Sequence, residues 1–333
     1  MLLTLKPTID LTLLSNNALM LGEQLIDLAK DYQSRCIVML DPFLSPIDDP
    51  VIDYFAAQKL IHQVKIMHPS VFAKKRPLLL ELDLSDLFQQ QVLIYTIDKA
   101  LNQKSIDYQI YGEGQQFCAW LLSSSEVPQI ANDLAKLALQ RYLNKTVLLR
   151  FYDSAVFSQL VTLLTQPQQR KLYGQIDKWI TLKNEKKLDI HSNQNQKTPV
   201  LSGALGLSLE QFALLYYIGI NNQIIKSQRM YQPDIYINEV ESLSLIMPCL
   251  QRLMSKGIKD EPLMVEWGTL ALKYQPNFDL HPLVINATKN FKTRYDYYRW
   301  LKSMSEQDWH LITDIDNENN KHKLIGDPNG YSS

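Results

Sequence analysis

Four short apolar runs, three of them closed by a charged residue or a proline, constrain the fold of this chain most strongly. They occupy residues 35–42, 77–83, 117–122 and 146–152. A run without polar alternation is typical of a strand covered on both faces. The segments between them repeat apolar residues at helical spacing, at 17–33, 50–67, 86–103, 126–143 and 154–165. This alternation predicts an α/β lobe with a mostly parallel sheet.

The pattern changes at a polar, breaker-rich stretch, residues 192–203. Two extended pieces just before it, near 176–182 and 187–192, are predicted to pair at an edge of the sheet. Beyond it the apolar spacing is helical only, at about 208–231, 236–256, 260–275, 282–292 and 294–311. The predicted organisation is an α/β lobe at 1–191, a linker at 192–203, an all-helical lobe at 204–315 and a disordered tail at 316–333.

Net charge narrows the class of partner, and cysteine usage indicates the cellular compartment. The formal net charge is −1, from 34 basic and 35 acidic residues, which argues against nucleic acid and against an anionic membrane surface. No apolar stretch approaches the roughly 20 residues that span a bilayer, and the N-terminus makes a poor signal peptide. Cys36, Cys118 and Cys249 lie far apart, as in a reduced protein. We expect a cytoplasmic protein.

The usual motifs of catalysis do not occur. Gly112-Glu113-Gly114 precedes a strand and predicts a turn, because a phosphate site needs glycines between a strand and a helix. Ser123-Ser124-Ser125 is not a nucleophile elbow and is better interpreted as a helix cap. The histidines show no metal-ligand spacing. We therefore predict no catalytic residue, no cofactor and no metal site.

One enzyme hypothesis stays open. Asp41, Asp83 and Asp153 each stand at the end of a predicted strand. In an open parallel sheet ligands bind outside the carboxyl ends of the strands, so three carboxylates there could hold Mg²⁺. Aspartates also cap helices and stop strands by turn chemistry, and we favour that structural interpretation. A metal-dependent α/β enzyme is the alternative function.

A resemblance to a known family is more specific. The segment Phe117–Trp179 runs strand, helix, Arg150-Phe151-Tyr152-Asp153, helix, then Gly174 and Trp179. It resembles the bacterial family catalogued as domain of unknown function 4123, whose pattern is "W-x-hydrophobic", "R-F-Y-D" and "F-G-P-I-x-x-W". The matching signature residues are Trp120, Arg150, Phe151, Tyr152, Asp153, Gly174 and Trp179. Phe278-Asp279-Leu280-His281-Pro282 is similar to a helix junction of full-length members.

The match has three departures from the family pattern. Pro42 stands where the family usually has Gly-Ala, and Ser154 and Gln175 stand where Pro is common. No charged or aromatic hallmark is lost. The resemblance implies a non-enzymatic, cytoplasmic adaptor or chaperone for type VI secretion. Such a protein binds one specific effector toxin, often encoded nearby, and helps to load it onto the VgrG spike; the implied partners are that toxin and VgrG.

The signature itself is predicted to be structural. Strand alternation over 146–152 would place Arg150 and Tyr152 on one face and Phe151 and Asp153 on the other. A buried arginine needs a partner, and the acidic strand ends Asp41, Glu81 and Asp83 are the candidates. Direct contact of Arg150 with the effector is the alternative.

The candidate binding surface is a second segment, Arg294 to Trp300. It contains Arg294, Tyr295, Tyr297, Tyr298 and Trp300, the residue types enriched at binding hot spots. Helical spacing predicts two aromatic faces. We expect one of them to be exposed for a partner; the alternative is that both pack between the lobes.

Overall fold

A computed structural model describes residues 6–43, 45–104, 108, 115–184, 186–193, 203–232 and 237–321, without the side chains of 314–321. The chain divides into two compact units, Met1–Leu215 and Tyr216–Ser333. Most of the predicted linker (194–202) and most of the predicted tail (322–333) lie outside the described residues. The domain limits inferred from the sequence therefore stay predictions.

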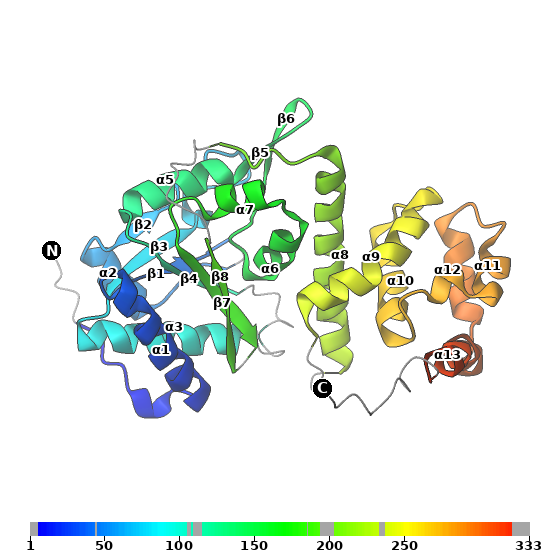
Figure 1. The fold of residues 1–333 in the computed structure, drawn as a ribbon, viewed down its shortest axis with the longest axis horizontal. Helices are drawn as coiled ribbons and strands as arrows, with labels where there is room; N and C mark the ends of the chain where they lie inside the picture. The colour runs from blue at the N-terminus through cyan, green and yellow to red at the C-terminus, as the bar shows by residue number, and fades with distance from the viewer. Residues whose placement is uncertain are drawn as a thin grey trace, which may run out of the picture. The chain divides into compact units, whose positions relative to one another are not determined.

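The first unit is built on one sheet, whose strand order is β2-β3-β1-β4-β7-β8 (Figure 1). The strands are β1 (Arg35–Leu40), β2 (Ile61–Gln63), β3 (Leu78–Asp83), β4 (Phe117–Leu122), β7 (Lys178–Asn184) and β8 (Lys187–Ser192). Every neighbouring pair is antiparallel. The prediction of a mostly parallel sheet is wrong.

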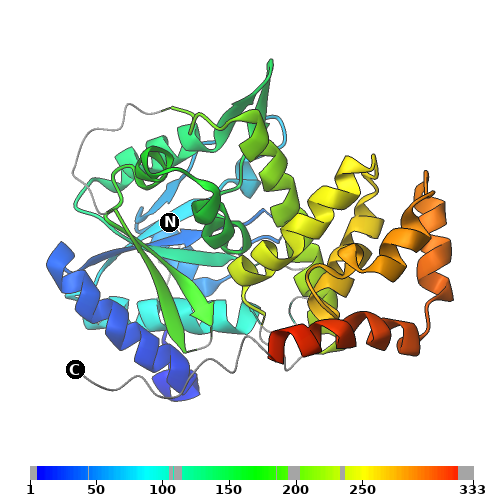
Figure 2. The same ribbon diagram turned by 45° about the vertical axis from the view of Figure 1, so that its right-hand side comes forward.

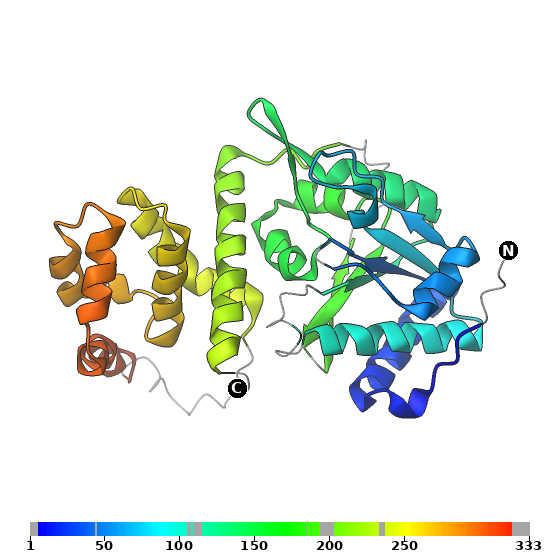
Figure 3. The same cartoon turned by 180° about the vertical axis from the view of Figure 1, so that it is seen from behind.

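The physical reason lies in how the sheet is covered. Helices α1 and α3 lie on one face and α5, α6 and α7 on the other (Figures 1, 2 and 3). A strand between two helical layers is apolar on both sides whatever its direction, so the continuous runs indicated burial and not parallel pairing. The predicted pairing of the last two strands is confirmed, since β7 and β8 form an antiparallel hairpin with β8 at the edge.

Most helices of this unit begin where the sequence supplies a capping side chain. They are α1 (Asn16–Ala29), α2 (Pro50–Ala57), α3 (Leu87–Gln103), α5 (Val127–Leu137), α6 (Ser154–Leu163) and α7 (Gln166–Tyr173). Ser15, Asp49, Asp86 and Asp153 accept hydrogen bonds from backbone N–H groups in the first turns of α1, α2, α3 and α6. Such caps satisfy donors that the helix itself cannot pair.

Two predicted elements end early. The helix expected at 50–67 stops at Ala57, and the short strand β2 follows. The helix expected at 126–143 stops at Leu137 and continues as β5 (Leu139–Tyr142), which pairs with β6 (Lys145–Leu148) in a separate hairpin. The fourth predicted strand, 146–152, is therefore neither part of the main sheet nor complete, because its last residues form a turn that leads into α6.

A large core fills the side of the sheet that faces α1 and α3. Trp120 is fully buried there, and its indole Nε1 donates a hydrogen bond to Thr96 Oγ1 of α3 at 3.0 Å. Gly22 lets α1 approach α3, because a Cβ at that position would lie 2.5 Å from Cγ1 of Ile94. The core of the first unit therefore depends on one buried polar contact and one close helix packing.

The second unit is helical in its described part. Its elements are α8 (Leu209–Tyr231), which begins in the first unit, α9 (Glu239–Ser255), α10 (Glu261–Lys273), α11 (Pro282–Thr288), α12 (Arg294–Ser303) and α13 (Glu306–Lys321). The predicted helices are confirmed, except that the one expected at 294–311 is divided into α12 and α13. In the described residues, no helix is long and apolar enough to cross a membrane.

Candidate functional site

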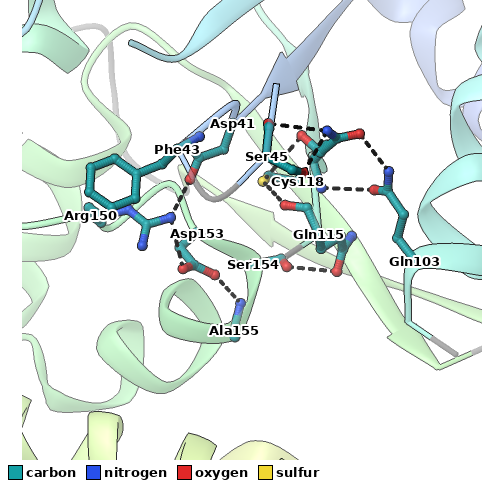
Figure 4. A network of polar contacts seen from close by, with 11 residues as sticks. Asp41, Phe43, Ser45, Gln103, Gln115, Cys118, Arg150, Asp153, Ser154 and Ala155 are labelled. Atoms are coloured by element: carbon teal, nitrogen blue, oxygen red, sulfur yellow. Dashed lines mark hydrogen bonds and ion pairs between the residues drawn. The ribbon is translucent and has the colours of Figure 1, made fainter. Parts of the chain in front are cut away.

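The signature arginine lies in an ion-pair cluster that joins three segments of the first unit (Figure 4). Arg150 Nη2 is 2.5 Å from Asp41 Oδ2, at the end of β1, and 3.3 Å from Asp153 Oδ2. Its guanidinium also stacks over the ring of Phe43, with 4.2 Å to the ring centroid. Asp153 in turn accepts a hydrogen bond from the N–H of Ala155 as the N-cap of α6. The cluster therefore ties the end of β1 to the start of α6.

Burial of this cluster removes its charged groups from water, which costs free energy. The Asp41 side chain is 2% exposed and that of Arg150 is 22% exposed. Burial raises the pKa of Asp41, and the attraction of Arg150 offsets only part of that rise. Burial of Arg150 disfavours its charged form, yet the two carboxylates together leave its pKa above the ordinary value. Each charge is thus the main compensation for burying the other.

A second polar network continues from the cluster (Figure 4). Gln103 Nε2 donates to Gln116 Oε1 at 3.0 Å, and Gln116 Nε2 donates to Ser45 Oγ at 2.9 Å. Ser154 Oγ donates to Gln115 Oε1 at 2.7 Å. Cys118 lies beside this network, and burial raises its pKa well above the ordinary value, so its thiol stays protonated. A protonated, buried thiol is not a nucleophile.

The acidic trio behind the enzyme hypothesis does not assemble. Asp83 pairs in register with Arg35 at the start of β1, whereas Asp41 follows the end of that strand. The carboxyl ends of two antiparallel neighbours lie at opposite ends of the sheet along the strand direction, which separates the two carboxylates by the length of a strand. Asp83 instead bonds to Ser85 in a turn. Among the described residues no group of three or more His, Cys, Asp or Glu side chains could hold a metal ion.

The same register decides which predicted partner Arg150 has. Asp41 is confirmed as that partner, with Asp153 as a second one. Glu81 instead lies 3.7 Å from Arg35 and 3.7 Å from His62. The alternation argument for Arg150 and Tyr152 was wrong, because these residues are not in a strand. The ion-pair cluster of Arg150 forms from a turn instead.

The other signature residues also serve the fold. Phe151 and Tyr152 are buried, and Trp179 of β7 stacks on Phe157 of α6 with ring centroids 4.4 Å apart. Gly174 follows α7 with a φ of 55°, a left-handed conformation that glycine adopts at little cost. None of these side chains presents a large exposed surface to a partner.

Helix α12 separates the predicted binding residues into two sets. Tyr297 is fully buried in an aromatic cluster, 5.4 Å from Trp267 and 5.1 Å from Phe291 between ring centroids. Trp300 is partly buried in the same cluster, 6.0 Å from Trp267. Tyr295 is 63% exposed. The aromatic face of α12 is thus mainly core, and Tyr295 is its exposed aromatic side chain.

A carboxylate at the N-cap of α10 holds α12 in place. Asp260 accepts from Arg294 Nη1 at 2.6 Å and from Tyr298 Oη at 2.9 Å. The hydrogen bond from Arg294 is the main cause of a lowered pKa for Asp260, and burial together with the bond to Asp260 raises the pKa of Tyr298 to about 12. Arg294 and Tyr298 therefore position the helix, although half of the Arg294 side chain remains exposed.

The helix-junction motif noted in the sequence is structural as well. Phe278 is fully buried against Trp267, with 4.8 Å between ring centroids. Asp279 receives two hydrogen bonds from Arg252 of α9, at 2.7 and 2.6 Å. His281 Nδ1 caps α11 by accepting from the N–H of Leu283. Sequence reasoning noted this motif only as a helix junction, because it carries no catalytic residue pattern.

The comparisons with known proteins agree with the sequence resemblance. Residues 66–171 match the model of the family described as "Domain of unknown function (DUF4123)", about a third of the 333-residue chain. The match includes Trp120 and the Arg150–Asp153 signature. Neither the search of curated proteins nor the search of solved structures found a match. The family is associated with adaptors of type VI secretion effectors. The resemblance to the DUF4123 family is therefore confirmed over residues 66–171.

Proposed function

We propose that this protein is an adaptor that binds one type VI secretion effector toxin and helps to load it onto the VgrG spike. The observation that carries the proposal is the family match over residues 66–171, since the family is associated with such adaptors. The protein acts by contact and has no catalytic step of its own. It works in the cytoplasm, where the toxin is made.

The arrangement of the signature residues supports a binding role. Arg150 is paired to two carboxylates, Asp41 and Asp153, and Cys118 is buried and protonated. These groups stabilise the fold of the first unit. Contacts with a partner must therefore come from exposed side chains outside the signature.

Tyr295 on α12 is the first candidate for such a contact. It is 63% exposed, and the Arg294 guanidinium stacks over its ring with 5.0 Å to the ring centroid. An exposed tyrosine held by an arginine is a rigid, amphipathic group of the kind found at hot spots. We propose that Arg294 and Tyr295, with the partly exposed Tyr298 and Trp300 beside them, contact the effector or the spike. Tyr297 is too deeply buried to take part.

Co-expression tests the proposed function. The toxin encoded by the gene adjacent to that of this chain is produced with and without it. We expect a soluble complex, and a toxin that is degraded or insoluble alone. Deletion of the gene for this chain should lower toxin abundance and delivery. Unchanged abundance and delivery would overturn the proposal.

A pair of tyrosine variants tests the contact surface. Tyr295→Ala should weaken the complex at least tenfold, since hot-spot truncations cost about 2 kcal/mol or more. Tyr231→Ala is the matched control, because Tyr231 is 83% exposed at the end of α8 and lies outside the proposed surface. Isothermal titration with the toxin, and separately with VgrG, identifies which partner is contacted. Equal affinities for the two variants would exclude Tyr295 from both interfaces.

A further inference from the structure

The last strand of the sheet, β8, has an outer edge that pairs with no other strand in the described residues. The N–H of Asn193, just after β8, donates to the carbonyl of Asp177 at 2.9 Å, before β7. In an antiparallel ladder the peptide groups of successive residues point alternately toward and away from the neighbour. With the register His191 opposite Trp179, the peptide groups of Leu188, Ile190 and Ser192 point away from β7.

These outward peptide groups have no partner strand in the described part of the chain. β8 stands at the end of the strand order, so among the described residues no further strand pairs with the outward peptide groups of Leu188, Ile190 and Ser192 (Figures 1 and 2). The side chains of Leu188 and Ile190 pack against the core, which fixes the position of the strand. A fixed strand with three free peptide groups is a ready template for another strand.

The charge around this edge favours an acidic strand. Residues 166–192 contain six basic residues against three acidic ones, in a chain whose formal net charge is −1. Lys183, Lys186 and Lys187 are exposed at the turn of the β7–β8 hairpin. Two copies of the same edge paired in parallel would bring these lysines together, whereas an acidic strand is attracted to them in either direction.

A pocket lies at the far end of the same strand. Its volume is about 310 Å³, and it lies between α6, α7 and the last residues of β8. Its polar lining includes Arg170, Gln166, Gln169, His191 and Asn193. The Arg170 side chain is exposed and makes no ion pair with any described residue. His191 Nε2 is 3.1 Å from Asp189 Oδ2, so this histidine has its own carboxylate. Arg170 is thus the cation available to a ligand.

We propose that the outer edge of β8 binds an extended, acidic segment of the effector as an additional strand. The backbone of that segment pairs with the peptide groups of Leu188, Ile190 and Ser192. One of its carboxylates enters the pocket and binds Arg170, the charge-assisted contact that arginine forms best. This inference rests on the proposed function, since it names the chemistry by which the effector is recognised.

Amide hydrogen exchange on the purified complex with the adjacent-gene toxin tests the pairing directly. In the free protein the amides of Leu188, Ile190 and Ser192 should exchange rapidly, while those of Asp189 and His191 are already protected by β7. Complex formation should slow exchange of the first set at least tenfold. A complex that forms without this protection overturns the inference and leaves the proposed function intact. Failure to form any complex counts against the proposed function itself.

Variants separate backbone pairing from side-chain packing. Ile190→Pro removes an outward N–H that β7 does not use, and proline is tolerated at such edge positions. Ile190→Ala is the control, because it loses the same side chain and keeps the N–H. We expect at least tenfold weaker toxin binding for the proline variant relative to the alanine variant. Equal binding would refute strand addition.

Two further measurements address the acidic character and the competing occupant. Overlapping peptides of the toxin are tested by fluorescence anisotropy, and the peptides that bind should be acidic and lose affinity with Arg170→Gln. Binding restricted to neutral or basic peptides would refute the charge argument. Protection of Ile190 in the chain alone that increases with its concentration, together with a dimer by light scattering, would show that a second copy occupies the edge instead.

Discussion

Replacing Arg150 by methionine should destabilise the first unit strongly and in a pH-dependent way. Arg150→Met keeps a long apolar stem over Phe43 and removes only the charge. Asp41, whose side chain is 2% exposed, then has no counter-charge. Asp153 is less affected, because its side chain is 23% exposed and still caps α6. The cost is therefore concentrated on one buried carboxylate.

Protonation of Asp41 limits how much unfolding free energy the Arg150→Met variant can lose. Deleting one partner of a buried pair costs about 3–5 kcal/mol. Asp41 can escape by binding a proton, and neutralising at pH 7 a carboxyl whose ordinary pKa is 3.8 costs roughly 4 kcal/mol, at about 1.4 kcal/mol per pH unit. Because the pKa of Asp41 is already raised in the native protein, part of this cost exists before the change. We expect a loss of about 3 kcal/mol in the free energy of unfolding at pH 7.

The sign of the pH dependence follows from linkage. In the variant the folded-state pKa of Asp41 lies further above its unfolded value, so the folded state binds more protons than the unfolded one. Stability then falls as pH rises above 3.8, and the deficit should shrink by about 1.4 kcal/mol for each pH unit lowered. Amide exchange in β1 and β4 at pH 7 and pH 5 measures this for the first unit alone.

The double variant Asp41→Asn with Arg150→Met is the matched control, since it removes both charges. Its stability should recover to within about 1–2 kcal/mol of the native protein, because no uncompensated charge remains. A loss in unfolding free energy below about 1 kcal/mol for Arg150→Met, or an equal loss at pH 7 and pH 5, would refute a stabilising role for the Arg150–Asp41 ion pair. Loss of toxin binding by a fully stable variant would instead support direct contact through Arg150.

Three further changes test other features of the structure. Gly22→Ala should destabilise α1 packing by about 1–3 kcal/mol, measured by urea unfolding, and adding Ile94→Ala should relieve the clash; additive losses would contradict it. Thr96→Val should cost about 1–3 kcal/mol by leaving the Trp120 indole N–H buried without an acceptor, while Thr96→Ser should cost less; equal losses would exclude the hydrogen bond. The lowered pKa of Asp260 means that its contribution is complete above its ordinary value of 3.8 and is lost as pH falls through the lower folded-state value. Asp260→Asn should therefore flatten the acid side of the thermal-midpoint profile of the second unit, and an unchanged profile would contradict that role.

The sequence was sufficient for most of the helices and strands and for one of the ion-pair partners of Arg150. Apolar runs identified β1, β3, β4 and the β7–β8 hairpin, because a buried strand consists largely of apolar residues. A buried arginine must have an acidic partner, and Asp41 is that partner as predicted. The short strands β2 and β5 were missed, because three or four residues do not establish a period of two against a neighbouring helix.

Sequence patterns could not show which residues lie close together in the folded protein. Asp41 and Asp83 have the same local sequence character, and only the antiparallel register places them at opposite ends of neighbouring strands. Helical spacing groups Tyr295 and Tyr297 on different faces of α12, yet the choice of the buried face depends on Trp267 and other rings supplied by distant segments.

The sequence by itself determined strands β1, β3, β4, β7 and β8, most helices of both units and the family whose model residues 66–171 match. Tertiary structure alone decided the direction of the strands and the separation of the acidic trio. The physical reason is that local patterns record whether a residue is buried, while strand direction and edge position depend on pairing between segments far apart in the chain.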